Sequence, residues 1–219
     1  MDPDFWQGRW ARNEIGWHQD DINVHLRGFW ERLEVAPGAP VFVPLCGKSL
    51  DIRWIAEQGH PVIGVELSAV AVEDFFREQG WEPARTAQGP FTRWHSGAVT
   101  LLCGDFFDLR PQDLAGASAV YDRASLIALP PPMRQRYAAH LTGLLAPGTR
   151  CLLVTFEYPQ QQMAGPPFSV TAEEVRHLYG DAFEVKELCE QDILQEQPRF
   201  REKGLTRLRE RVFHLLRRG

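Results

Sequence analysis

Residues 41–66 read VFVPLCGKSLDIRWIAEQGHPVIGVE, and this stretch indicates the fold of the chain. It opens with a short apolar run over 41–45 and breaks into a turn at 46–49. Apolar residues then recur at helical spacing over 50–58, and a second apolar run follows over 62–65. A strand, a turn, a helix and a second strand in this order form the unit from which parallel α/β sheets are built.

An acid, Glu66, closes the second apolar run. In such a unit the turn lets a ligand approach the backbone at the start of the helix. An acid about 20 residues further on can accept hydrogen bonds from a ribose. This stretch therefore predicts a cofactor that carries a nucleoside.

Three interpretations of this unit compete. A phosphate-binding loop needs a glycine five positions before Gly47, where Phe42 stands. A dinucleotide-binding turn needs three glycines, and only Gly47 is present. S-adenosylmethionine has a ribose but no phosphate, so one close backbone approach and one acid suffice. It fits best, and Asp105 and Phe106, which follow a later apolar run, offer a polar group and an aromatic edge for its adenine.

The rest of the chain alternates between predicted helices and predicted strands. One predicted helix covers 22–33, capped by Asp20 or Asp21, and the next covers 69–79, capped by Ser68, with Val70, Val72, Phe75 and Phe76 inward. Two more cover 133–145 and 171–180, and the last of these starts at a capping box formed by Thr171 and Glu174. The predicted strands are a hairpin of 91–95 and 99–103, core strands at 117–121 and 150–156, and terminal strands at 183–194 and 206–216. The segment 206–216 can also be interpreted as a helix. This alternation predicts an α/β domain with a mostly parallel sheet.

Ligands of parallel α/β sheets bind beyond the carboxyl ends of the strands. That rule places Leu45–Ser49, Glu66, Asp105 and the pair Asp122–Arg123 around one crevice.

The composition is ordinary for a globular protein. Of the 219 residues 44% are hydrophobic and 24% are charged, and the net charge of −5 comes without a basic stripe. Nucleic-acid binding is therefore not expected. No apolar stretch of the sequence approaches the roughly 18–20 residues that a membrane span needs, so a membrane span is not expected either. The N-terminus is acidic and aromatic, so we expect no secretory signal and a cytoplasmic location.

The four cysteines are scattered, with no CxxC pair that would indicate zinc, so we expect reduced thiols and no metal. The arginines near the C-terminus alternate with apolar residues, and we interpret them as the solvated side of a last element.

Seven short motifs together resemble the thiopurine S-methyltransferase family, and its bacterial members most closely. They are Trp6-x-x-x-Trp10, Trp17-His18, PLCGKS at 44–49, GVELS at 64–68, FF-x-EQ at 75–79, Asp122-Arg123 and GPPF at 165–168. The resemblance covers almost the whole chain in one register. It implies a class I S-adenosylmethionine-dependent methyltransferase. Its fold would be a Rossmann-like, doubly wound, mostly parallel sheet with an antiparallel C-terminal strand. Residues 1–219 would form a single domain with a helical N-terminal lid over 1–35.

The resemblance also implies an activity, which is methyl transfer to the sulfur of aromatic or heterocyclic thiols such as thiopurines. Bacterial members are associated with selenium and tellurium compounds as well, so a selenol or related acceptor is an alternative. A non-catalytic cofactor-binding module is a second alternative. The implied S-adenosylmethionine contacts are Trp10, Leu45, Gly47, Glu66 and Arg123, with Asp105 and Phe106 at the adenine.

On the acceptor side, the resemblance implies Trp17 over the active site and Arg123 as the catalytic residue. Arg123 would contact the cofactor carboxylate or the electron-rich acceptor sulfur. His18, beside Trp17, is a candidate proton acceptor or a packing residue of the lid. The family carries a second arginine near the acceptor, and Arg199 and Arg201 are both candidates for it. We expect a monomer.

Overall fold

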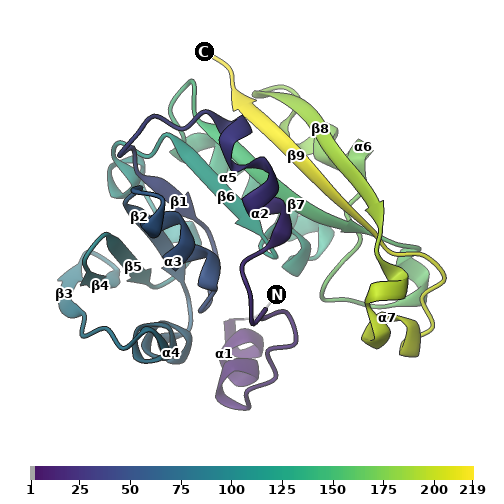
Figure 1. The fold of residues 1–219 in the computed structure, drawn as a ribbon, viewed down its shortest axis with the longest axis horizontal. Coiled ribbons are helices and arrows are strands. Elements are labelled where there is room, and N and C mark those ends of the chain that lie inside the picture. The colour runs from purple at the N-terminus through teal and green to yellow at the C-terminus, as the bar shows by residue number, and fades with distance from the viewer. Residues whose placement is uncertain (1–2) are drawn as a thin grey trace. The chain divides into compact units, whose positions relative to one another are not determined.

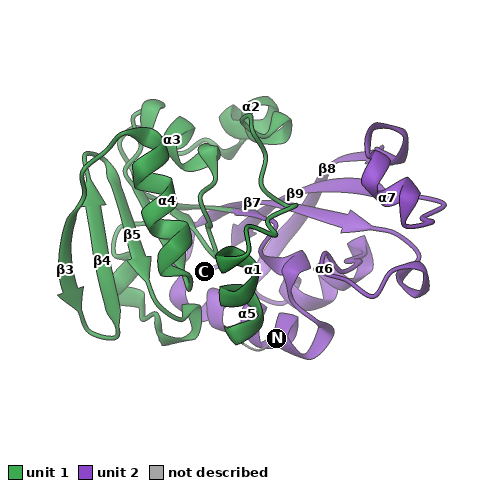
Figure 2. Cartoon of the chain, turned by 90° about the horizontal axis from the view of Figure 1, so that it is seen from below, with its two compact units in different colours: residues 1–121 green, residues 122–219 purple. Residues whose placement is uncertain are grey.

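The computed structural model describes residues 3–219. The chain forms two compact units, residues 1–121 and residues 122–219 (Figure 2). The boundary falls within one strand, β6, which runs from Ala119 to Arg123.

The first unit is built on a sheet in which four strands run parallel. Its strand order is β3-β4-β5-β2-β1-β6 (Figure 1). The strands are β1 (Val41–Val43), β2 (Val62–Glu66), β3 (Ala84–Gln88), β4 (Phe91–Ser96), β5 (Val99–Cys103) and β6. β1 pairs in parallel with β2 and β6, and β2 pairs in parallel with β5. β4 is antiparallel to β3 and β5, which confirms the predicted hairpin; β3 was not predicted.

The described part of the first unit contains four α-helices, and the last three of them begin at a side chain that accepts hydrogen bonds from free backbone N–H groups. The four helices are α1 (Pro3–Ala11), α2 (Val24–Phe29), α3 (Leu50–Glu57) and α4 (Ala69–Gln79), with 3₁₀ turns η1 (Trp30–Leu33), η2 (Phe106–Asp108) and η3 (Pro111–Leu114). Ser49 caps α3 and Ser68 caps α4, as predicted for Ser68.

Two details of the helix predictions are wrong. The cap of α2 is Asn23, whose side chain accepts hydrogen bonds from the N–H groups of His25 and Leu26, so neither Asp20 nor Asp21 fills this position. Val70 is 44% exposed and does not face inward, because the buried face of α4 is formed by Ala71, Val72, Phe75 and Phe76.

The second unit combines helices with an antiparallel three-stranded arrangement. The strands are β7 (Arg150–Glu157), β8 (Phe183–Asp192) and β9 (Arg209–Arg217), and β9 lies between β7 and β8, antiparallel to both. The helices are α5 (Pro131–Leu144), α6 (Ala172–Tyr179) and α7 (Pro198–Glu202), with 3₁₀ turns η4 (Leu126–Ala128), η5 (Gln160–Gln162) and η6 (Leu194–Glu196). The antiparallel C-terminal strand is confirmed, and the helical alternative for 206–216 is excluded.

One arginine of the C-terminal run is not solvated as expected. Arg211 is only 7% exposed, and its Nε lies 2.7 Å from a carboxylate oxygen of Glu157. Its Nη1 also pairs with Glu187 and Glu190 of β8. Arg211 therefore joins three strands through a partly buried ion network. The alternation of apolar and charged residues along β9 does not reveal these long-range ion pairs.

Two further observations concern membrane-spanning helices and the state of the cysteines. Among residues 3–219, no helix is both long enough and apolar enough to cross a membrane. All four cysteines are free; Cys46 and Cys151 are buried, while Cys103 and Cys189 are partly buried.

Candidate functional site

Glu66, at the end of β2, is the centre of the candidate cofactor site. Its Oε2 accepts a hydrogen bond from the N–H of Gly47 at 2.9 Å, and its Oε1 accepts one from the N–H of Ser68 at 2.8 Å. The side chain is 6% exposed, and none of the ion pairs between described residues includes it. A carboxylate oxygen has two lone pairs, so each oxygen can still accept a hydroxyl.

Burial raises the pKa of Glu66 above its ordinary value, while the N–H groups of Ser68, Gly47 and Leu67 act in the opposite direction. The three N–H groups favour the ionised form that a hydroxyl-bearing ligand needs.

The turn between β1 and α3 has an unusual backbone. Leu45 has φ 43° and Gly47 has φ 52°, both in the left-handed region. A leucine rarely adopts this conformation, and strain of this kind is concentrated at functional sites. A side chain at Gly47 would also be crowded, because its Cβ would lie 3.1 Å from Cζ2 of Trp10. The turn thus presents its backbone closely to the N-terminal helix and to Glu66.

The predicted adenine corner lies beside Glu66. The N–H of Gly104 donates a hydrogen bond to the backbone carbonyl of Glu66 at 2.9 Å. Asp105 is exposed and caps the next turn, since its Oδ1 accepts a hydrogen bond from the N–H of Phe107 at 2.9 Å. Phe106 is 3% exposed and packs edge-to-face on Phe107. One carboxylate oxygen of Asp105 therefore holds the backbone of this corner in place, in addition to the role predicted for Asp105 at the adenine.

The tryptophans of the N-terminal segment form one aromatic cluster around Trp17. The ring of Trp17 lies 5.3 Å from that of Trp6 and 5.8 Å from that of Trp10, both edge-to-face. The guanidinium carbon of Arg9 lies 5.5 Å from the Trp17 ring centroid. Trp10 is buried against Gly47, so this cluster is anchored on the turn that also contacts Glu66.

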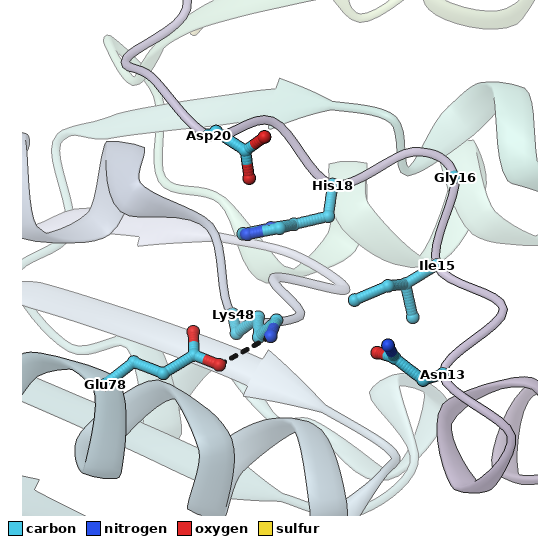
Figure 3. A pocket seen from close by; sticks show the side chains of 7 residues that line it. All are labelled: Asn13, Ile15, Gly16, His18, Asp20, Lys48 and Glu78. Carbon is cyan, nitrogen blue, oxygen red and sulfur yellow. Dashed lines mark hydrogen bonds and ion pairs between the residues drawn. The ribbon is translucent and has the colours of Figure 1, made fainter.

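His18 lines a cleft of about 590 Å³ between the N-terminal segment and the same turn (Figure 3). Opposite it, Lys48 Nζ lies 2.6 Å from a carboxylate oxygen of Glu78, and Lys48 is only 9% exposed. The remaining lining residues are Asn13, Ile15, Gly16 and Asp20. Lys48 was not predicted as part of this cleft. The sequence around Lys48 does not predict this ion pair, because Glu78 lies 30 positions further along the chain.

In the second unit, Arg123 follows Asp122 at the end of β6 and is partly buried. Its guanidinium forms no hydrogen bond or ion pair with any described residue. The pKa of Arg199 is lowered, first by reduced hydration and then by the positive charge of Arg123. Two guanidinium groups whose charges interact, and which form no ion pair with a described residue, attract an anion.

The electrostatic interaction with Arg123 distinguishes between Arg199 and Arg201, the two candidates for the second arginine near the acceptor. Arg199 lies close enough to Arg123 for their charges to interact, whereas Arg201 donates a hydrogen bond to the side chain of Gln195 at 3.2 Å. Sequence spacing could not make this distinction because α7 is short and irregularly connected.

The structure thus brings the predicted residues together in two groups. Trp10, Leu45, Gly47, Glu66, Asp105 and Phe106 surround the ends of β1, β2 and β5, and Trp17 and His18 join this group through Trp10 and the cleft. Arg123 belongs to the second unit, where it neighbours Arg199.

The sequence matches the model of one protein family, described as thiopurine S-methyltransferase, over residues 1–218. The chain belongs to the thiopurine S-methyltransferase family.

Relatives in this family are similar over their full length. A thiopurine S-methyltransferase from Nitrosospira multiformis is 50% identical over 100% of this chain and 99% of its own. One from Pseudomonas putida is 52% identical over 99% of this chain and 100% of its own. Family membership makes the chain an S-adenosylmethionine-dependent methyltransferase.

Solved structures show the same fold at low identity. A methyltransferase from Anabaena variabilis has a TM-score of 0.69 and 14% identity, covering 100% of this chain and 96% of its own. A 1,6-didemethyltoxoflavin-N1-methyltransferase from Burkholderia thailandensis, solved with 1,6-didemethyltoxoflavin and S-adenosylhomocysteine, has a TM-score of 0.64 and 17% identity, covering 99% of this chain and 87% of its own. The Rossmann-like architecture of this thiopurine S-methyltransferase family member is therefore that of S-adenosylmethionine-dependent methyltransferases. The strained turn and the free lone pairs of Glu66 fit this cofactor.

Proposed function

We propose that this protein transfers the methyl group of S-adenosylmethionine to the sulfur of an aromatic or heterocyclic thiol, such as a thiopurine. The full-length match to the thiopurine S-methyltransferase family carries this proposal. The neighbouring arginines, Arg123 and Arg199, support it because they favour an electron-rich or anionic acceptor.

For the cofactor, we assign Glu66 to the ribose hydroxyls and the Leu45 carbonyl to the amino acid end. Gly47 permits the close approach, and Trp10 covers the turn from the N-terminal side. Asp105 and Phe106 form the adenine corner beside Glu66. When bound, S-adenosylmethionine supplies an activated methyl group on a sulfonium that is a good leaving group.

The protein's own residues have mainly a positioning role. Holding two reactants in line can contribute roughly 7–11 kcal/mol to lowering the barrier. The aromatic cluster around Trp17 excludes water, and Arg123 with Arg199 stabilises negative charge on the acceptor. Aromatic thiols ionise readily, so we assign His18 to the lining of the cleft and to lid packing rather than to obligatory proton removal.

The proposal is tested by a radiolabelled methyl transfer assay on a thiopurine, a simple aryl thiol and a selenol. Transfer to the thiols that drops at least tenfold in Arg123→Ala is the expected result. Preference for the selenol would identify a different soft acceptor. Binding of S-adenosylhomocysteine in calorimetry without transfer to any acceptor would reveal a non-catalytic module. We expect a His18→Ala variant to retain most of its turnover. Inactivation of this variant would show that His18 accepts the proton of the acceptor thiol.

We further propose that the protein is a monomeric, single-domain, cytoplasmic enzyme acting on small molecules without a nucleic-acid or membrane partner. Light scattering coupled to size exclusion tests the oligomeric state, and a dimer mass would contradict this part.

A further inference from the structure

A fully buried carboxylate stands next to Arg123. Asp122 is 0% exposed, and the ion pairs of residues 3–219 leave it without a cationic partner. Its Oδ2 accepts a hydrogen bond from the hydroxyl of Tyr137 at 2.7 Å, and its Oδ1 accepts one from the N–H of Leu126 at 3.3 Å. A buried carboxylate without a cation opposes folding. Stability alone therefore does not explain an aspartate at this position.

The hydrogen bonds of Asp122 close a tight turn that contains Arg123. Ser125, which is fully buried, also bonds to the carboxylate through its backbone and its side chain. Between them Ala124 has φ 64°, a left-handed conformation that an alanine adopts only when its surroundings impose it. The backbone from Asp122 to Leu126 is thus bound to one carboxylate, and that carboxylate is bound to α5 through Tyr137.

Arg123 depends on this turn for its orientation. Its guanidinium has no hydrogen bond or ion pair with any residue that the structure describes, so no side chain holds it in place. Arg199 repels it. The geometry points to Asp122, held by Tyr137, as a positioning residue that keeps Arg123 directed at its ligand. This inference rests on the proposed role of Arg123 in acceptor or cofactor binding.

The surroundings of Asp122 make this positioning sensitive to pH. Three titratable groups face it: Tyr137 from α5, Tyr179 from α6 and Cys151 from β7, and burial raises the pKa of each well above its ordinary value. Burial also raises the pKa of Asp122 from 3.8 to about 6, although Tyr137, Leu126 and Ser125 act in the opposite direction. Asp122 is therefore the group among these four that changes charge between pH 5 and 8.

Protonation weakens the carboxylate as a hydrogen-bond acceptor, so the turn should loosen below about pH 6. An Asp122→Asn variant resembles the protonated state at every pH. We expect its kcat/KM to be about tenfold below that of the wild type at pH 7.5 and to approach the wild-type value at pH 5. The ratio of the two enzymes at each pH is the readout, because ionisation of the acceptor thiol affects both equally.

Tyr137→Phe provides a second variant and Tyr179→Phe its matched control. Tyr137→Phe removes a hydrogen bond that favours the ionised form, so the acid limb of its profile should move upward by roughly one pH unit. The buried hydroxyl of Tyr179 has no hydrogen-bond partner among the described residues, so Tyr179→Phe should leave the profile in place. Thermal unfolding checks that each variant is folded.

The outcomes separate this inference from the proposed function. If Arg123→Ala lowers kcat/KM but the Asp122→Asn ratio is independent of pH and the Tyr137→Phe profile is unshifted, the positioning role is wrong and the proposed function stands. If Arg123→Ala has no effect, the proposed role of Arg123 fails, and the positioning role fails with it.

Discussion

At the scale of single residues, Glu66 serves both the fold and the candidate site. Its two oxygens satisfy the N–H groups of Gly47 and Ser68, which belong to the turn before α3 and to the cap of α4. The same carboxylate is the one assigned to the cofactor ribose. A substitution at this position should therefore affect stability and cofactor binding together.

We expect Glu66→Ala to lower the free energy of unfolding by about 2–4 kcal/mol, because two buried N–H groups lose their acceptor. It should also weaken binding of S-adenosylhomocysteine by at least tenfold. Urea unfolding and calorimetry measure the two effects on one preparation. Unchanged cofactor affinity in a folded variant would refute the ribose assignment.

Asp122 has a pH-dependent effect on stability whose sign follows from its pKa. The folded-state pKa, about 6, lies above the ordinary value of 3.8, so the folded protein binds the proton more tightly than the unfolded chain. The stabilisation of the fold by this proton on Asp122 is present below the unfolded-state pKa of 3.8 and is lost as the pH rises through 6. Relative to Asp122→Asn, the wild type should lose about 2 kcal/mol between pH 4 and pH 7. Parallel stability profiles for the two proteins would contradict this.

At the scale of elements, α1 is the least firmly held helix of the candidate site. Trp10 is its one buried residue among those described, and it packs on Gly47 through a contact that needs a glycine. Elements with few buried contacts open most readily. An aromatic helix of this kind is suited to act as a lid over the cofactor turn.

Trypsin can cut α1 after Arg9 and near its end after Arg12, so limited digestion reports on opening of the lid. We expect saturating S-adenosylhomocysteine to slow cleavage at these two sites several-fold, because the closed lid protects them. Adenosine, which lacks the amino acid end of the cofactor, serves as the comparison. Equal cleavage rates with and without S-adenosylhomocysteine would rule out a cofactor-dependent lid.

At the scale of the whole molecule, the two compact units share strand β6, which crosses the boundary between residues 121 and 122. Neither unit has a complete set of strands if the chain is divided there. We therefore expect the protein to unfold as a single domain in one cooperative transition.

The distribution of tryptophan makes this testable. All seven tryptophans lie at or before residue 94, so their fluorescence reports on the first unit alone, while circular dichroism reports on both units. Urea transitions followed by the two signals should coincide. Separate midpoints would show that the units unfold independently.

The sequence by itself determined the strand–turn–helix–strand unit at 41–66, the caps at Ser68 and Thr171, and the acid at Glu66. These features depend on hydrogen bonds and apolar spacing between residues that are close in the chain, and Thr171 Oγ1 does accept the N–H of Glu174 at 3.1 Å.

Only the tertiary structure decided the contacts of Trp10 with Gly47, Arg211 with Glu157 and Asp122 with Tyr137, and the electrostatic interaction of Arg199 with Arg123. Each pair is separated by 15 or more positions, as Asp122 and Tyr137 are by 15 and Arg211 and Glu157 by 54. Local pattern constrains which element a residue joins, but only packing of those elements determines which side chain it meets and whether its charge is buried.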